Sequence, residues 1–75
     1  MKIPEDEKHF LYGRAFKKGD NLMPCDCAEI IGKRRFHKYG KEECIRVIIE
    51  LMQRCNFYCD SEEAEIALDI FPQQS

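Results

Sequence analysis

Apolar residues between positions 41 and 55 recur every three or four residues, which is the spacing of one face of an α-helix. At about 100° per residue they fill an arc of about 200°. An ordinary surface helix needs an apolar stripe of only about 100°. The pattern predicts a helix over about 41–55 that either lies at the centre, covered from two sides, or keeps part of its apolar face for a partner.

A further helix is predicted near the start of the chain. Pro4 and the acidic residues after it suit a first helical turn, because proline lacks an N–H that is unpaired there and acids favour the positive end of the helix dipole. Gly19 suits the end, so this helix is expected over about 4–18. The aromatic residues within 10–16 are also common in strands, and the sequence leaves that choice open.

Two more helices are predicted from capping signals. Asp26 and Asp60 are each followed three residues later by a glutamate, which has the form of a capping box. Glycine can end a helix in a left-handed conformation, and proline cannot continue one. The two helices are expected over about 26–39 and about 61–71, ended by Gly40 and Pro72.

The length and composition predict one small globular unit. A chain of 75 residues closes a single core, and 44% hydrophobic with 35% charged residues is typical of a folded domain rather than a disordered tail. We expect residues 1–75 to form a single all-α domain, a bundle of three or four short helices. The helix over 41–55 is expected at its centre, with 72–75 as a frayed tail.

Five cysteines are many for this length, and their number is odd. The opening residues, MKIPEDEKHF, carry acids where a secretion signal has an apolar stretch, and no apolar run reaches the roughly 18 residues that span a bilayer. Reduced thiols in a cytoplasmic protein with no membrane contact are therefore expected rather than disulfides. A small zinc-stabilised domain is the alternative, with ligands drawn from Cys25, Cys27, His37, Cys55 and Cys59.

The sequence does not combine the groups that catalysis needs. Cys25 and Cys27 lie near the expected start of a helix, where the dipole lowers a thiol pKa, but a nucleophilic thiolate also needs a base and an oxyanion donor. No G-x-S-x-G, Walker A or HExxH motif is present. We expect no catalytic residue and no cofactor, and a protein that is not an enzyme.

The charge is unevenly distributed along the chain. The net charge of −2 divides into +1 over residues 1–20, +3 over 21–41 and −6 over 42–75. The basic middle segment favours either the solvated, cationic end of a helix or contact with the phosphates of a nucleic acid. The nucleic-acid alternative would use Lys33, Arg34, Arg35, Lys38 and Lys41.

Residues 12–24, YGRAFKKGDNLMP, carry a Tyr-Gly and an Ala-Phe pair followed by Gly19 and Pro24, and Phe36 with Gly40 follow later. This pattern resembles ribosome modulation factor and related small phage or prophage helical proteins. The resemblance covers residues 12–40, and the Trp-rich close of that family is absent because the chain has no Trp. It implies a short bacterial or phage protein that acts by docking on a larger assembly.

The breadth of the apolar arc in residues 41–55 favours a binding role. We predict a small adaptor or regulatory protein that binds another protein, or a second copy of itself, through surplus apolar surface on this helix and the connection after it. The acidic last helix would tune the choice of partner. The residues expected to contact the partner are Ile45, Ile49, Met52, Phe57 and Tyr58.

Overall fold

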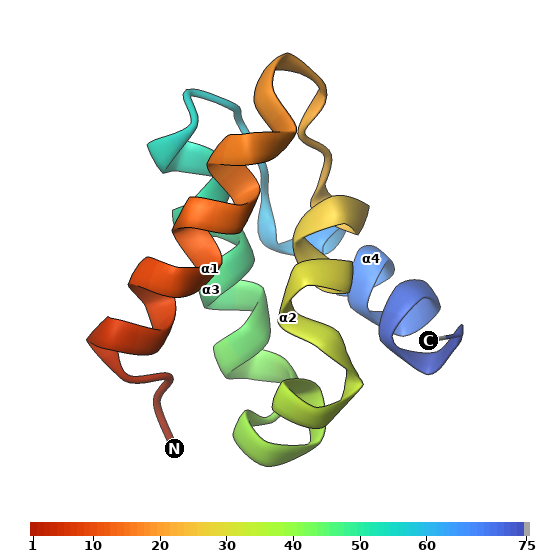
Figure 1. Cartoon of the computed structure of the whole chain (residues 1–75). Helices are drawn as coiled ribbons and strands as arrows, with labels where there is room; N and C mark the ends of the chain where they lie inside the picture. The colour runs from red at the N-terminus through yellow and green to blue at the C-terminus, as the bar shows by residue number, and fades with distance from the viewer. Residues whose placement is uncertain (75) are drawn as a thin grey trace.

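A computed structural model of the protein describes residues 1–74, with side chains up to Phe71. It consists of helices and no strand within these residues, which confirms the predicted all-α fold and places the ambiguous segment 10–16 inside a helix. The helices, shown in Figure 1, are α1 (Glu5–Lys18), the 3-10 turn η1 (Gly19–Asn21), α2 (Pro24–Tyr39), α3 (Lys41–Arg54) and α4 (Ser61–Gln74).

Helices α2 and α3 form the middle of the bundle. They pack on each other, and each contacts both α1 and α4, whereas α1 and α4 have no contact between their described residues. In Figure 1, α1 lies on one side of the central pair and α4 on the other. The wide apolar arc of α3 is therefore covered from two sides, and the core draws its largest fully buried side chains from every helix: Leu11, Ile31, Val47, Ile48 and Leu68.

The start of α2 differs from the prediction. The helix begins at Pro24, two residues earlier than expected, and Met23 is its N-cap. Asp26 is therefore the third helical residue, where its Oδ2 accepts a hydrogen bond from the Met23 N–H at 2.9 Å. Pro24 suits the first position because the N–H that it lacks has no partner inside a helix. The prediction that Asp26 opens a capping box with Glu29 is therefore wrong, because Asp26 is itself the third residue of a box that begins at Met23.

Gly32 interrupts α2, which the sequence pattern did not predict. Its φ of 81° and ψ of 165° are not helical, so α2 consists of two helical segments that meet at a kink. Only glycine adopts this region of backbone space readily, because any Cβ would be strained there. The kink changes the direction of residues 33–39 relative to the first half of the helix, as Figure 1 shows.

The remaining helix ends follow the predictions except at the C-terminus. Gly40, with φ of 90°, separates α2 from α3, and Asp60 caps α4 because its Oδ1 accepts the Glu63 N–H at 2.9 Å. The expected end at Pro72 is wrong, since α4 continues to Gln74. Proline's fixed φ is compatible with a helix, and near the end it removes only one intrahelical hydrogen bond. The tail predicted to fray, residues 72–75, is described only for the backbone of 72–74. Ser75 and the side chains of 72–74 lie outside the described part of the chain.

The residues before α1 are fixed to α3 by a partly buried polar contact. Ile3 lies in the core, and its N–H donates to Glu43 Oε2 at 2.8 Å. The same carboxylate accepts a hydrogen bond from Arg46 Nη2 at 2.8 Å. Glu43 therefore bonds both the backbone before α1 and a side chain of its own helix. Burial alone would raise the pKa of Glu43, but the bonds from Arg46 and from the Ile3 N–H outweigh it and lower that pKa.

Candidate functional site

The basic stretch of residues 33–41 does not form one cationic face. Arg35 Nε pairs with Glu7 Oε1 at 2.8 Å, and Lys41 Nζ pairs with Asp69 Oδ1 at 2.8 Å and with Glu65 Oε2 at 3.1 Å. The hydrogen bonds that the Lys41 ammonium donates to Asp69 and Glu65 raise the pKa of Lys41. Two of the five predicted phosphate-binding cations therefore hold the helices together.

The hydroxyl of Tyr39 belongs to the same network. It donates to Glu7 Oε2 at 2.6 Å, and this bond, followed by the bond from Arg35, lowers the pKa of the Glu7 carboxyl. Lys38 lies over the Tyr39 ring at 5.3 Å, and Phe36 is half-buried against the core instead of free to stack on a base. Lys33, Arg34 and Lys38 are exposed. Only these three of the five predicted cations therefore remain available to contact phosphates.

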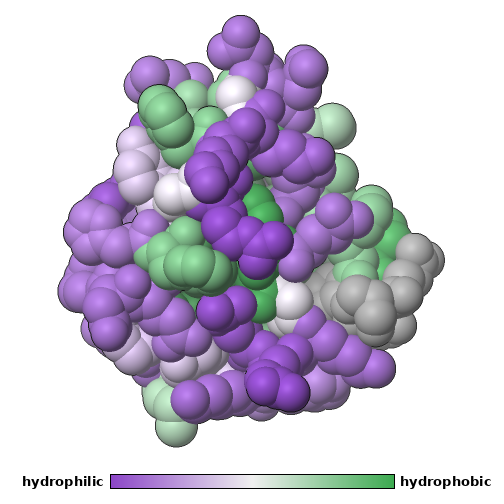
Figure 2. Space-filling model, in the orientation of Figure 1, coloured by the Kyte–Doolittle hydropathy of each residue, from purple (hydrophilic) through white to green (hydrophobic). Residues whose placement is uncertain are grey.

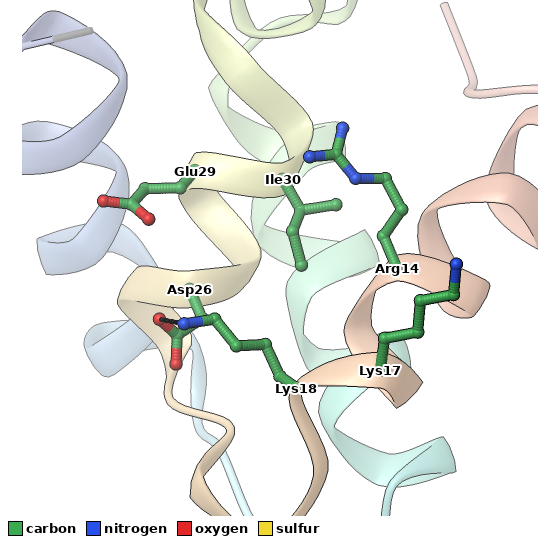
Figure 3. A pocket seen from close by; sticks show the side chains of 6 residues that line it. All are labelled: Arg14, Lys17, Lys18, Asp26, Glu29 and Ile30. Atoms are coloured by element: carbon green, nitrogen blue, oxygen red, sulfur yellow. Dashed lines mark ion pairs between the residues drawn. The ribbon is translucent and has the colours of Figure 1, made fainter.

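A polar groove of about 380 Å³ lies between α1 and the first half of α2. Arg14, Lys17 and Lys18 line it from α1, as Figure 3 shows, and acidic residues line it from α2. Lys18 Nζ reaches across the groove to Asp26 Oδ1 at 3.4 Å. The acidic side opposes a phosphate, so this groove is a mixed-charge surface rather than an anion site.

The five cysteines are all free, and they differ in burial. Burial raises the pKa of the Cys27 thiol to about 12, with smaller contributions from Cys55, Cys59 and Cys25. Cys44 is buried in α3, and burial raises its pKa to about 11. Thiols with such pKa values are protonated at neutral pH, so Cys27 and Cys44 are not activated nucleophiles.

The alternative zinc set is not assembled in the structure. His37 lies at the far end of α2 from Cys25 and Cys27, beyond the kink. Within the part of the chain that the structure describes, no group of three or more His, Cys, Asp and Glu side chains is placed to hold a metal ion. A tetrahedral zinc site needs four ligands converging at about 2.0–2.3 Å, and the observed arrangement does not provide this.

Most of the partner-binding residues predicted on α3 belong to the protein's own core. Met52 is only 2% exposed, so its prediction as a contact residue is wrong. Ile45, Ile49 and Phe57 are half-buried and pack against the core. Tyr58 is 83% exposed and stands alone in this group. The sequence left two possibilities for the wide apolar arc of α3, which could be covered by neighbouring helices or exposed to a partner. The structure shows that it is covered.

Three large exposed aliphatic side chains lie together elsewhere, where α4 meets the start of α2. Met23 is 58% exposed, Ile66 53% and Ile70 44%. They border a shallow apolar depression of about 230 Å³, which we name the α4 groove. Figure 2 shows apolar surface at the right of the view, over α4. The groove is lined by Met23, Pro24, Cys25, Glu63, Ile66, Ala67, Ile70 and Phe71.

The sequence of α4 explains why this groove is apolar. Ala64, Ala67 and Leu68 face the core, and Ile66 and Ile70 lie one turn apart on another side of the helix. Glu62, Glu63, Glu65 and Asp69 are exposed on the same helix, which carries no basic residue. Two isoleucines at i and i+4, outside the stripe that packs on the core, are the signal by which the sequence could have identified this surface.

A second apolar surface lies on α1, which has no contact with α4 between their described residues. Phe10 is 55% and Phe16 66% exposed, and both lie in the exposed stripe of positions 9, 10, 13, 16 and 17, which we name the α1 face. The guanidinium groups of Arg14 and Arg35 lie 5.9 and 5.8 Å from the Phe10 ring centre. The α1 face therefore combines exposed aromatic rings with positive charge.

Comparison with protein-family models, with curated proteins and with solved structures found no match to this chain. The resemblance of residues 12–40 to ribosome modulation factor therefore stays a prediction. Among the helices described, none is long and apolar enough to cross a bilayer. The candidate site consequently depends on the geometry of this chain alone.

Proposed function

We propose that this protein is a small, non-enzymatic interaction module, an adaptor or regulator, that binds another protein through the α4 groove. The observation that carries the proposal is the exposure of Ile66 and Ile70 beside Met23, three aliphatic side chains around one depression. Each square ångström of apolar surface covered by a partner contributes about 25 cal/mol. The acidic Glu63 also lines the groove, and an apolar centre with a polar edge is the arrangement expected of a specific protein interface.

The thiols support a binding role over nucleophilic chemistry. Burial keeps Cys27 and Cys44 protonated, with pKa values of about 12 and about 11. The five free cysteines also support a place in a reducing compartment such as the cytoplasm. The engagement of Arg35 and Lys41 in ion pairs weakens the case for a nucleic-acid partner.

Affinity capture with three baits tests this proposal. The wild-type chain, Ile66→Lys and Tyr58→Lys are immobilised separately in a lysate of the source organism, and the retained proteins are compared. Both substitutions place a lysine at an exposed site, so they are matched in charge and in their small effect on folding. We expect the wild type and Tyr58→Lys to retain the same protein and Ile66→Lys to lose most of it.

Two results would contradict the proposal. Retention by Ile66→Lys together with loss by Tyr58→Lys would place the binding surface near the α3–α4 connection. Capture that disappears after nuclease treatment, and that is lost with Arg34→Ala, would indicate a nucleic-acid partner instead. Thermal melting of each bait confirms that all three remain folded.

A further inference from the structure

The two exposed apolar surfaces lie on different helices, α1 and α4, which have no contact between their described residues. We infer that the α4 groove of one copy binds the α1 face of a second copy, so that copies associate head to tail. This inference rests on the proposed function and names the occupant of the same groove. The occupant is a helix with exposed phenylalanines and basic residues, which this chain itself presents.

Charge complementarity is the first argument. Helix α4 carries only acidic charges, concentrated in its first half at Glu62, Glu63 and Glu65. Helix α1 ends in basic residues, with Arg14 and Lys17 exposed and without an ion pair to another described residue. An antiparallel arrangement brings the basic end of α1 to the acidic start of α4. The acidic first turn of α1 then lies beside the uncharged end of α4.

Shape is the second argument. In an antiparallel register that sets Lys17 against Glu62, the helical repeat sets Gly13 against Ile66 and His9 against Ile70. Apart from its chain neighbours and the backbone of its own helix, nothing lies within 4 Å of a Cβ built on Gly13, so the centre of the α1 face is open to a neighbouring side chain. A glycine at this point permits close approach of the two helices. Phe10 and Phe16 flank the position and would cover Ile66 from both sides.

The charges also disfavour a symmetric pair. Two copies joined through α4 alone would bring acidic residues together, because α4 has no basic residue to offset them. A contact between different faces is heterologous, and it leaves one free groove and one free α1 face at the ends of every assembly. The expected product is therefore a series of short oligomers rather than a closed dimer.

A single helix pair makes a small interface, and interfaces below about 1,200 Å² are typically weak and transient. We therefore expect the weight-average mass in sedimentation equilibrium to rise steadily between about 0.02 and 1 mM protein. Raising NaCl from about 0.05 to 0.5 M should weaken the association at least about threefold, because the paired charges become screened. Tyr58→Lys should behave as the wild type does.

Mixing two blocked variants tests the head-to-tail geometry. Ile66→Lys removes the groove and keeps the α1 face, and Phe16→Glu removes the α1 face and keeps the groove. Both sites are more than half exposed, at 53% and 66%, so the variants should stay folded. Each variant alone should be a monomer at every concentration. The equimolar mixture should form a dimer containing one of each, and nothing larger.

Three outcomes would overturn the inference. A wild-type chain that stays monomeric at the highest concentration shows that a different protein occupies the groove. Variants that still associate alone show that another surface is used, and a mixture that stays monomeric contradicts the head-to-tail contact. The first outcome leaves the proposed function intact if Ile66→Lys still loses its captured partner, so the two failures can be distinguished.

Discussion

At the scale of single residues, burial decides which side chains can react and which can only pack. Cys27 and Cys44 are fully buried and have raised pKa values, whereas Cys25 and Cys55 are partly exposed. The sequence showed only that thiols were numerous and irregularly spaced. The difference among them arises from tertiary packing, which spacing along the chain does not encode.

Thiol labelling should follow this difference. In the native protein at about pH 8, an alkylating reagent should modify Cys25 and Cys55 at least tenfold faster than Cys27 and Cys44, because alkylation requires an accessible thiolate. Peptide mass spectrometry measures the rates, and denatured protein is the control in which all sites react alike. Equal rates in the native protein would show that the buried thiols open readily to solvent.

Glu43 gives the fold a dependence on acid. Its pKa is lowered in the folded protein, so its stabilising effect is present above the unfolded pKa of about 4.5 and is lost as the pH falls through the lower, folded pKa. Glu43→Gln should lower the free energy of unfolding at neutral pH by about 1–2 kcal/mol. The difference from the wild type should shrink as the pH falls below about 4.5.

Urea denaturation at several pH values measures this effect. Glu42→Gln is the matched control, since Glu42 is an exposed neighbour on the same helix. A similar loss of stability in both variants would mean that the bonds from Ile3 and Arg46 contribute nothing specific.

At the scale of helices, the sequence predicted the helices and most of their ends, which depend on local pattern. It did not predict the kink in α2 or the exposed apolar surface of α4, which depend on tertiary packing. Helix α3 was recognised from its broad apolar arc, and Asp60 and Gly40 marked helix ends correctly. Gly32 was predicted to be helical because a single glycine inside an amphipathic segment is compatible with either a continuous helix or a kink. The exposed isoleucines of α4 were overlooked because its core-facing stripe alone explained a helix.

The kink in α2 depends on glycine at position 32. Gly32→Ala should destabilise the protein by about 1–3 kcal/mol, because an alanine at φ of 81° and ψ of 165° is strained. Thermal melting followed by circular dichroism measures the change. If the variant were as stable as the wild type, α2 could straighten without cost, and the kink would not be required by the fold.

Gly13 should respond in the opposite direction. It lies in the exposed, regular interior of α1 with open space around it, so Gly13→Ala should stabilise the protein by about 0.5–1 kcal/mol through helix propensity. Gly13→Arg should also fold, but it should abolish self-association by filling the centre of the α1 face. Loss of stability in Gly13→Ala would show that α1 needs a glycine for its own fold.

At the scale of the whole molecule, the central pair of helices separates two surfaces of different chemistry. The α1 face is aromatic and basic, and the α4 groove is mainly aliphatic, with Glu63 in its lining. The sequence showed a strongly acidic segment, −6 over residues 42–75, but residues 1–20, which contain α1, sum to only +1. The fold places α1 and α4 on different sides of the central pair (Figure 1), without contact between their described residues. The proposed binding role therefore depends on how the fold places Ile66 and Ile70 beside Met23, and the spacing of the isoleucines alone does not give that placement.

The most direct test of the binding surface is photo-crosslinking in cells of the source organism. A photoreactive amino acid is placed at position 66 in one variant and at position 58 in another, both exposed in the folded chain. The account predicts a covalent protein adduct from position 66 and little or none from position 58, with mass spectrometry identifying the adduct as a second copy or another protein. An adduct formed from position 58 and absent from position 66 would contradict it.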